Sequence, residues 1–145
     1  NGIFSPDANC TRGQIAAFLW RAAGQPKPTT TVNPFTDIKP TDYNYQAILW
    51  AYEQGITSGT SSNTFSPNAD CTRAQLVSFL WRAEGSVAAD GSTFQDVSGS
   101  AYYANAISWA VQKGITSGTG GNSFSPDAVC SRAQAVTFLY RNAMK

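Results

Sequence analysis

Apolar residues recur along the chain at the three- and four-residue spacing that is typical of amphipathic helices. Ala47, Ile48 and Ala51 share one face of a helix predicted over 43–54, and the same pattern returns over 102–113. A glycine follows each segment, at the position where a helix C-cap belongs. The two segments therefore predict a pair of equivalent helices.

A second type of helix is predicted where a polar pattern precedes an apolar run. In the segment TRAQ at 72–75, the hydroxyl and the amide three residues later can form a capping box, and apolar residues at helical spacing follow. Thr11 and Ser131 open equivalent segments. We expect helices to begin directly after Thr11, Thr72 and Ser131.

This succession of helices is an internal repeat. Residues 35–83 align with 94–142 without a gap and share 26 of 49 positions, and the pattern FSPxAxC begins at 4, 65 and 124. Such repetition is typical of repeat architectures. The predicted organisation is the back half of a first repeat over 1–23, a Pro/Thr-rich linker over 24–34, a second repeat over 35–85, a short linker over 86–93 and a third repeat over 94–145.

The segments between the two helices of each repeat are loops. Residues 56–65 and 115–124 are rich in Gly, Ser, Thr and Asn, a composition that favours turns. Short extended pieces are expected within them, at 56–57 and 64–65. The predicted fold class is therefore mainly α, built from helix–loop–helix repeats with short extended segments in the loops.

Composition narrows the range of functions. The chain has no histidine, which excludes Ser-His-Asp and Cys-His catalysis and most zinc sites. Ten Lys+Arg against nine Asp+Glu give a net charge of +1, which argues against binding to nucleic acid or acidic membranes. The sequence has no stretch of roughly 18 consecutive apolar residues that would insert into a membrane. We expect a binding protein and no enzyme, with no metal and no cofactor.

The three cysteines, Cys10, Cys71 and Cys130, occupy one repeated position directly before the capping residue. Cysteine often acts as a small buried hydrophobe, and that is the role we expect here. A three-thiolate metal site would require the three positions to converge, and no histidine could serve as a fourth ligand.

All six arginines lie at repeated positions. Arg12, Arg73 and Arg132 fall in the first helical turn, where the helix dipole disfavours a cation by about 0.3–1 kcal/mol. A bound carboxylate or phosphate would compensate this cost, because a helix N-terminus and a guanidinium together attract anions. Internal pairing with the repeated carboxylates Asp37 and Asp96 is the other explanation, and residue types alone favour it slightly.

Two further repeated features could belong to a site. Tyr43 and Tyr102 stand at the entrance of the predicted first helices, where a ring could stack on a sugar or pack in the core. Both explanations remain open. The GITSGT loops place Gly59 and Gly118 beyond the helix cap. Small residues let a ligand approach the backbone there, and the neighbouring hydroxyls offer hydrogen bonds.

These ordered motifs, FTDI, YNYQAI, GITSGT and FSPNADCTRAQ in the second repeat, resemble the S-layer homology (SLH) repeat. The resemblance implies a bacterial cell-surface anchoring module, extracellular and associated with the cell wall or S-layer. SLH repeats usually act in threes and pack as a pseudo-threefold, mainly helical body. Grooves between the repeats bind anionic, often pyruvylated, secondary cell-wall polymers, so the implied partner is a cell-wall glycan.

The resemblance also implies a set of ligand-binding residues, in which arginines clamp a carboxylate, a tyrosine stacks on sugar and loop groups donate hydrogen bonds. These residues are Arg12, Arg73, Arg132, Asp37, Asp96, Tyr43, Tyr102, Gly59, Thr60, Gly118 and Thr119.

The chain departs from the family pattern in four ways. Glutamine replaces the glutamate of the family's Thr-Arg-Ala-Glu motif, tyrosine replaces a tryptophan, cysteine replaces the usual aliphatic residue before the capping residue, and the first repeat lacks its front half. The missing half either lies upstream, outside this chain, or comes from a neighbouring copy. The second possibility gives the alternative function, a self-assembling subunit of a surface layer or filament whose partner is another copy of itself.

Overall fold

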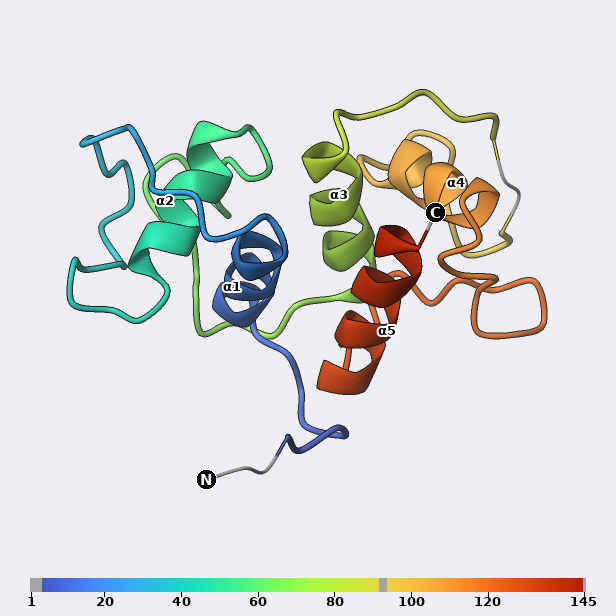
Figure 1. Cartoon of the computed structure of the whole chain (residues 1–145). Coiled ribbons are helices and arrows are strands. Elements are labelled where there is room, and N and C mark those ends of the chain that lie inside the picture. Colours follow the sequence, from blue (N-terminus) through green and yellow to red (C-terminus); the bar gives the residue numbers. More distant parts are fainter. Residues whose placement is uncertain (1–3, 92–93, 145) are drawn as a thin grey trace. The chain divides into compact units, whose positions relative to one another are not determined.

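The structure is a computed structural model that describes residues 4–91 and 94–144. Residues 1–3, 92–93 and 145, which belong to the predicted first repeat, second linker and third repeat, lie outside the described residues. The described part is helical and contains no strand, which confirms the predicted fold class (Figure 1). Its helices are α1 (Arg12–Ala22), α2 (Tyr45–Glu53), α3 (Arg73–Ala83), α4 (Ala104–Gln112) and α5 (Arg132–Ala143). None of these described helices has both the length and the apolar character that crossing a bilayer demands.

The helices α1, α3 and α5 begin where the sequence predicts. Thr11, Thr72 and Ser131 each accept a hydrogen bond from the backbone N–H three residues later, and the glutamine at that position caps the N–H of the capping residue in return. All three are complete capping boxes. The predicted caps are therefore confirmed.

The helices α2 and α4 are shorter than predicted, by two residues at the start and one at the end. In the second repeat, Asp42 explains the later start. Its side chain accepts a hydrogen bond from the Lys39 N–H, and its carbonyl accepts one from the Tyr45 N–H. These bonds form a turn over residues 39–45. Because of this turn, the helix begins only at Tyr45. The glycines that end the helices, Gly55 and Gly114, have φ of +75° and +73°, as expected for a helix C-cap.

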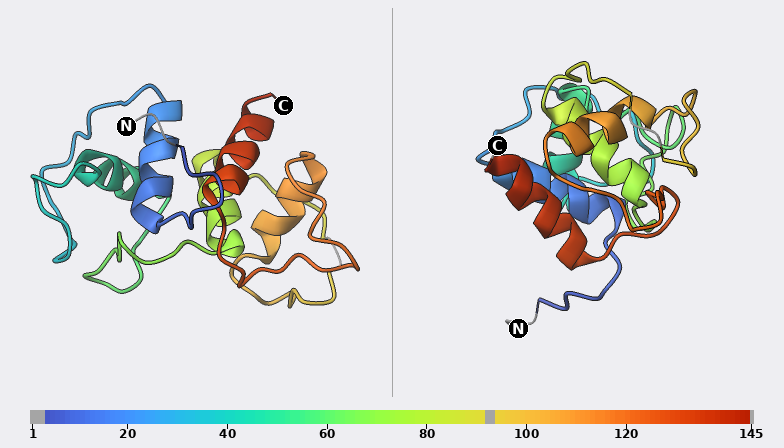
Figure 2. Two further views of the ribbon diagram at one scale, coloured as in Figure 1. Left: turned by 90° about the horizontal axis from the view of Figure 1, so that it is seen from below. Right: turned by 90° about the vertical axis from the view of Figure 1, so that its right-hand side faces the viewer.

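The chain forms two compact units. The central unit is Thr11–Asp70, and the flanking unit comprises the residues up to Cys10 together with those from Cys71 onward. In the central unit α1 packs against α2, and in the flanking unit α3 packs against α4 (Figures 1 and 2). The second helix of one repeat therefore packs against the first helix of the next repeat.

The core of the central unit combines both helices with the loop segments that follow α2 and precede it. Its buried side chains are Ala16, Ala17, Phe35, Ile38, Ala47, Ile48, Leu49 and Phe65. Phe35 and Phe65 are in ring contact, with centroids 5.7 Å apart. The core therefore depends on residues from the first repeat and from the second.

Both linkers are attached to the helices beside them. The indole N–H of Trp20 donates to the Pro26 carbonyl, and that of Trp81 donates to the Val87 carbonyl, both at 2.8 Å. In the first linker, the Glu53 carboxylate also accepts a hydrogen bond from the Thr30 N–H at 2.9 Å. The described parts of both linkers are therefore held against the neighbouring helices.

Candidate functional site

One phenylalanine residue of the second repeat is held on both sides by predicted site residues. Oδ1 of Asp37 accepts a hydrogen bond from the Phe65 N–H at 2.9 Å, and Oδ2 accepts one from the Ser66 N–H at 2.8 Å. Nε of Arg12 donates to the Phe65 carbonyl at 2.9 Å, and the guanidinium lies 4.8 Å from the centroid of the Phe65 ring. Asp37 and Arg12 are thus connected through Phe65.

The third repeat has the same arrangement. Asp96 accepts hydrogen bonds from the N–H groups of Phe124 and Ser125 at 2.9 and 2.8 Å. Nε of Arg73 donates to the Phe124 carbonyl at 2.9 Å, with the guanidinium 4.6 Å from the ring centroid. The hydrogen bond from the Phe124 N–H lowers the pKa of Asp96, and burial lowers the pKa of Arg73.

Arg132 repeats this contact with the N-terminal segment. Its Nε donates to the Phe4 carbonyl at 2.8 Å, and its guanidinium lies 5.0 Å from the Phe4 ring centroid. Arg12 and Arg73 each expose 4% of their surface, whereas Arg132 is half-buried. The main contacts of these arginines therefore organise the loops, and the first-turn cation is stabilised by a carbonyl and an aromatic ring.

The predicted loop residues also make internal contacts. Gly59 has φ of +93°, and a Cβ there would overlap the carbonyl oxygen of Thr64. Gly118 has φ of +95° and is equally crowded by the carbonyl of Ser123. The hydroxyl of Thr60 lies 2.6 Å from that of Ser66 in a hydrogen bond. The second glycine of each GITSGT loop is therefore required by the tight turn.

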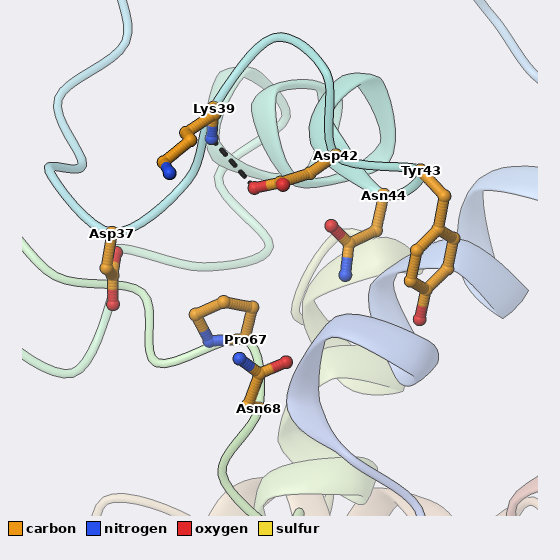
Figure 3. A pocket seen from close by; sticks show the side chains of 7 residues that line it. All are labelled: Asp37, Lys39, Asp42, Tyr43, Asn44, Pro67 and Asn68. Atoms are coloured by element: carbon orange, nitrogen blue, oxygen red, sulfur yellow. Dashed lines mark hydrogen bonds between the residues drawn. The ribbon is translucent and has the colours of Figure 1, made fainter.

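A cavity of about 300 Å³ lies in the central unit, and two predicted site residues line it. Its walls come from the turn before α2 and from the segment after Phe65 (Figure 3). The lining residues are Asp37, Lys39, Asp42, Tyr43, Asn44, Pro67 and Asn68. Tyr43 is 67% exposed, so its ring is available to a ligand. Gly59 and Thr60 are not among the lining residues.

The amide of Asn44 is the most buried polar group of the cavity. The residue exposes 5% of its surface, its side chain does not cap α2, and it points toward Pro67 and Asn68 (Figure 3). Gly13 makes room for it, because a Cβ at position 13 would overlap the Asn44 amide nitrogen. A buried amide that faces a polar cavity can both donate and accept hydrogen bonds there.

The equivalent positions of the third repeat have a different character. Ser98 stands where Lys39 does, Asp127 stands where Asn68 does, and Tyr103 replaces Asn44. The central unit therefore has a cation beside its cavity, while the third repeat has an added carboxylate in place of an amide. Sequence reasoning missed Lys39, Asn44 and Asn68 because it looked for residues that repeat, and these are positions where the repeats differ.

The molecule is thus built from tandem helix–loop–helix repeats, and in the second and third repeats an arginine and an aspartate hold the loop by bonding to one phenylalanine. The family described as the S-layer homology domain matches residues 34–77 and 93–136. The chain belongs to this family, as its motifs suggested, and that membership places it among bacterial cell-surface proteins.

Three relatives illustrate the breadth of the family. The chain is 35% identical to an endoglucanase of Bacillus sp. (strain KSM-635), over 74% of the chain and 11% of the relative. It is 32% identical to the surface-layer 125 kDa protein of Lysinibacillus sphaericus, over 95% of the chain and 12% of the relative. It is 26% identical to the cellulosome-anchoring protein of Acetivibrio thermocellus, over 97% of the chain and 33% of the relative. The chain spans a third or less of the length of each of these relatives.

Proposed function

We propose that this chain anchors a larger surface protein, without a covalent bond, to an anionic glycan of the cell wall. The observation that carries the proposal is the cavity of the central unit, where Lys39, Asn44 and Tyr43 offer a cation, an amide and an exposed ring. A pyruvylated sugar presents a carboxylate, hydroxyls and an apolar sugar face, which match these three groups. The two carboxylates of the lining, Asp37 and Asp42, already accept hydrogen bonds from backbone N–H groups. A relative named as a cellulosome-anchoring protein supports the general role.

In this proposal Lys39 pairs with the carboxylate, Tyr43 stacks on the sugar and Asn44 hydrogen-bonds to a hydroxyl. Arg12 and Asp37 act as positioning residues, because together they fix Phe65 and therefore the segment that carries Pro67 and Asn68. No chemical step is required. The endoglucanase and the other relatives named as enzymes share only a small part of their length with the chain, and catalysis is not part of the proposed role.

Co-sedimentation with purified Gram-positive cell walls tests the proposal. The walls are used intact, after mild acid removal of the pyruvate ketals, and after extraction of the secondary polymer. We expect binding to intact walls that weakens with salt, falls after removal of pyruvate and is lost after extraction. Equal binding to all three preparations would contradict the proposal.

Substitutions locate the site. Lys39→Gln and Tyr43→Ala remove exposed groups and should leave the fold intact, and each should weaken binding about tenfold, the equivalent of ~1.4 kcal/mol. Lys27→Gln is the matched control, because Lys27 is an exposed lysine of the same unit outside the cavity. If Lys39→Gln and Tyr43→Ala bind walls as well as the parent does, the cavity is not the anchoring site.

A further inference from the structure

The backbones of the three cysteines form a closed ring of hydrogen bonds in the flanking unit. The Cys10 N–H donates to the Cys130 carbonyl at 3.0 Å, the Cys130 N–H to the Cys71 carbonyl at 2.9 Å, and the Cys71 N–H to the Cys10 carbonyl at 2.8 Å. All three residues are fully buried. The three cysteines are therefore buried, as sequence analysis expected, and their positions also converge.

The register of this ring places each cysteine directly opposite the other two. Antiparallel bridges at Asn9–Ser131 and Thr72–Val129 flank two of the pairs. Opposed residues of antiparallel pairs have Cα atoms roughly 4.5–5.5 Å apart, inside the range of about 4.4–6.8 Å that disulfides require. Side chains of such opposed residues also lie on the same side of the backbone.

The Cys130 thiol is in contact with both of the other thiols. A hydrogen bond with the Cys130 thiol, together with burial, raises the pKa of Cys10 far above its ordinary value. The Cys130 thiol is hydrogen-bonded to Cys10, which lowers its pKa, but its hydrogen bond with Cys71 and its burial outweigh that effect and raise the pKa to about 12. The three cysteines are free thiols, and no trio of potential ligands among the described residues is arranged to hold a metal ion.

We propose that the three cysteines are a modification site at which any two close into one intramolecular disulfide, leaving the third as a thiol. The oxidant is a low-molecular-weight disulfide such as oxidised glutathione. A cysteine thiolate attacks it, forming a mixed disulfide and releasing one reduced thiol. A second cysteine then attacks the protein sulfur of the mixed disulfide and releases the second reduced thiol of the reagent. One S–S bond breaks and one forms, and the two electrons and two protons of the cysteines pass to the reagent.

The closed ring resists this reaction, because buried thiols with raised pKa hold little thiolate. The N-terminal segment gives access. Phe4 is 44% exposed, whereas its counterparts Phe65 and Phe124 are fully buried, so opening of residues 4–10 uncovers less of the phenylalanine side chain than opening of either equivalent segment. Opening of this segment exposes Cys10 and uncovers the other two thiols. The disulfide then joins two of the three chain segments that carry Cys10, Cys71 and Cys130 in the flanking unit.

The decisive measurement is the disulfide-to-dithiol ratio of the full chain in a glutathione buffer, determined folded and in urea. Free thiols are alkylated after denaturation, and the intact mass is read. We expect a monomer that has lost two hydrogen atoms and carries one alkyl group, favoured by about 10²- to 10³-fold when folded, because a bond compatible with the fold stabilises it by the same factor. A ratio no greater than in urea overturns the proposal, as do glutathione adducts or intermolecular dimers as the only products.

Single variants test the interchange of partners. Cys10→Val, Cys71→Val and Cys130→Val each leave a different pair, and each should still form its disulfide with no thiol remaining. A second measurement uses the wild-type chain and so does not depend on any variant folding. The thermal midpoint of the oxidised chain should lie about 10 °C above that of the reduced chain. If the wild-type product contains a single fixed pairing and the other two pairs never close, the proposed equivalence is wrong.

Discussion

Replacing Arg73 by alanine should destabilise the flanking unit strongly, whether or not a ligand is present. Its Nε hydrogen bond to the Phe124 carbonyl is buried, and a charge-assisted bond of that kind contributes about 1.5–3 kcal/mol. Its guanidinium lies 4.6 Å from the centroid of Phe124 and 5.5 Å from that of Phe138, which adds roughly 0.5–2 kcal/mol. The loss should therefore be about 2–5 kcal/mol, without counting the cavity that alanine leaves.

Urea unfolding followed by circular dichroism measures this loss. Arg73→Lys keeps the charge but cannot place an N–H at the Nε position, and it should recover about half of the loss. Arg21→Ala is the control, because Arg21 is exposed in the last turn of α1 and should cost under about 1 kcal/mol. If Arg73→Ala and Arg21→Ala unfold within about 1 kcal/mol of each other, Arg73 does not hold the loop and the contact energies above are wrong.

Three further outcomes are expected. The lowered pKa of Asp96 means that its contribution to stability is present above about pH 4, the unfolded value, and is lost as the pH falls below it. Asp96→Asn should remove that part of the acid dependence of the thermal midpoint. Gly59→Ala, strained and crowded, should cost at least ~2 kcal/mol in urea unfolding, whereas Gly55→Ala, with open space around its Cβ, should cost about 1 kcal/mol. Gly13→Ala should destabilise the fold, because the added Cβ overlaps the Asn44 amide. In a double-mutant cycle, Asn44→Ala should reduce the cost of Gly13→Ala by roughly 1 kcal/mol. Additive effects would contradict the contact between positions 13 and 44.

The parts of the fold that are encoded locally could be predicted from the sequence. A capping box needs only a hydroxyl and a glutamine three residues apart, so the starts of α1, α3 and α5 follow from a short pattern. The later start of α2 could not be predicted in this way. It depends on a turn in which Asp42 uses both its side chain and its carbonyl, a choice that helical periodicity does not reveal.

The candidate site could be predicted only in part, because its contacts join residues that are far apart in the sequence. The sequence shows that Arg12 and Asp37 recur, and chemistry suggests an anion or a carboxylate as the partner of such an arginine. It does not show that a carbonyl 53 residues away takes the Nε hydrogen bond. The cavity residues Lys39 and Asn44 were missed for the opposite reason, since a comparison of repeats discards positions that differ. Where repeats share one scaffold, these differing positions are where one repeat can acquire a binding property that the others lack.

The arginine contacts also decide what the folding unit is. Arg12 of the first repeat holds Phe65 of the second, Arg73 of the second holds Phe124 of the third, and Arg132 of the third holds Phe4 of the first. Each repeat thus supplies a helix that completes the loop of another, and the order closes on itself. A single sequence repeat would expose an unpaired carbonyl and an unpacked phenylalanine, which small modules cannot compensate. The repeats are therefore interdependent in folding, even though each is recognisable alone in the sequence.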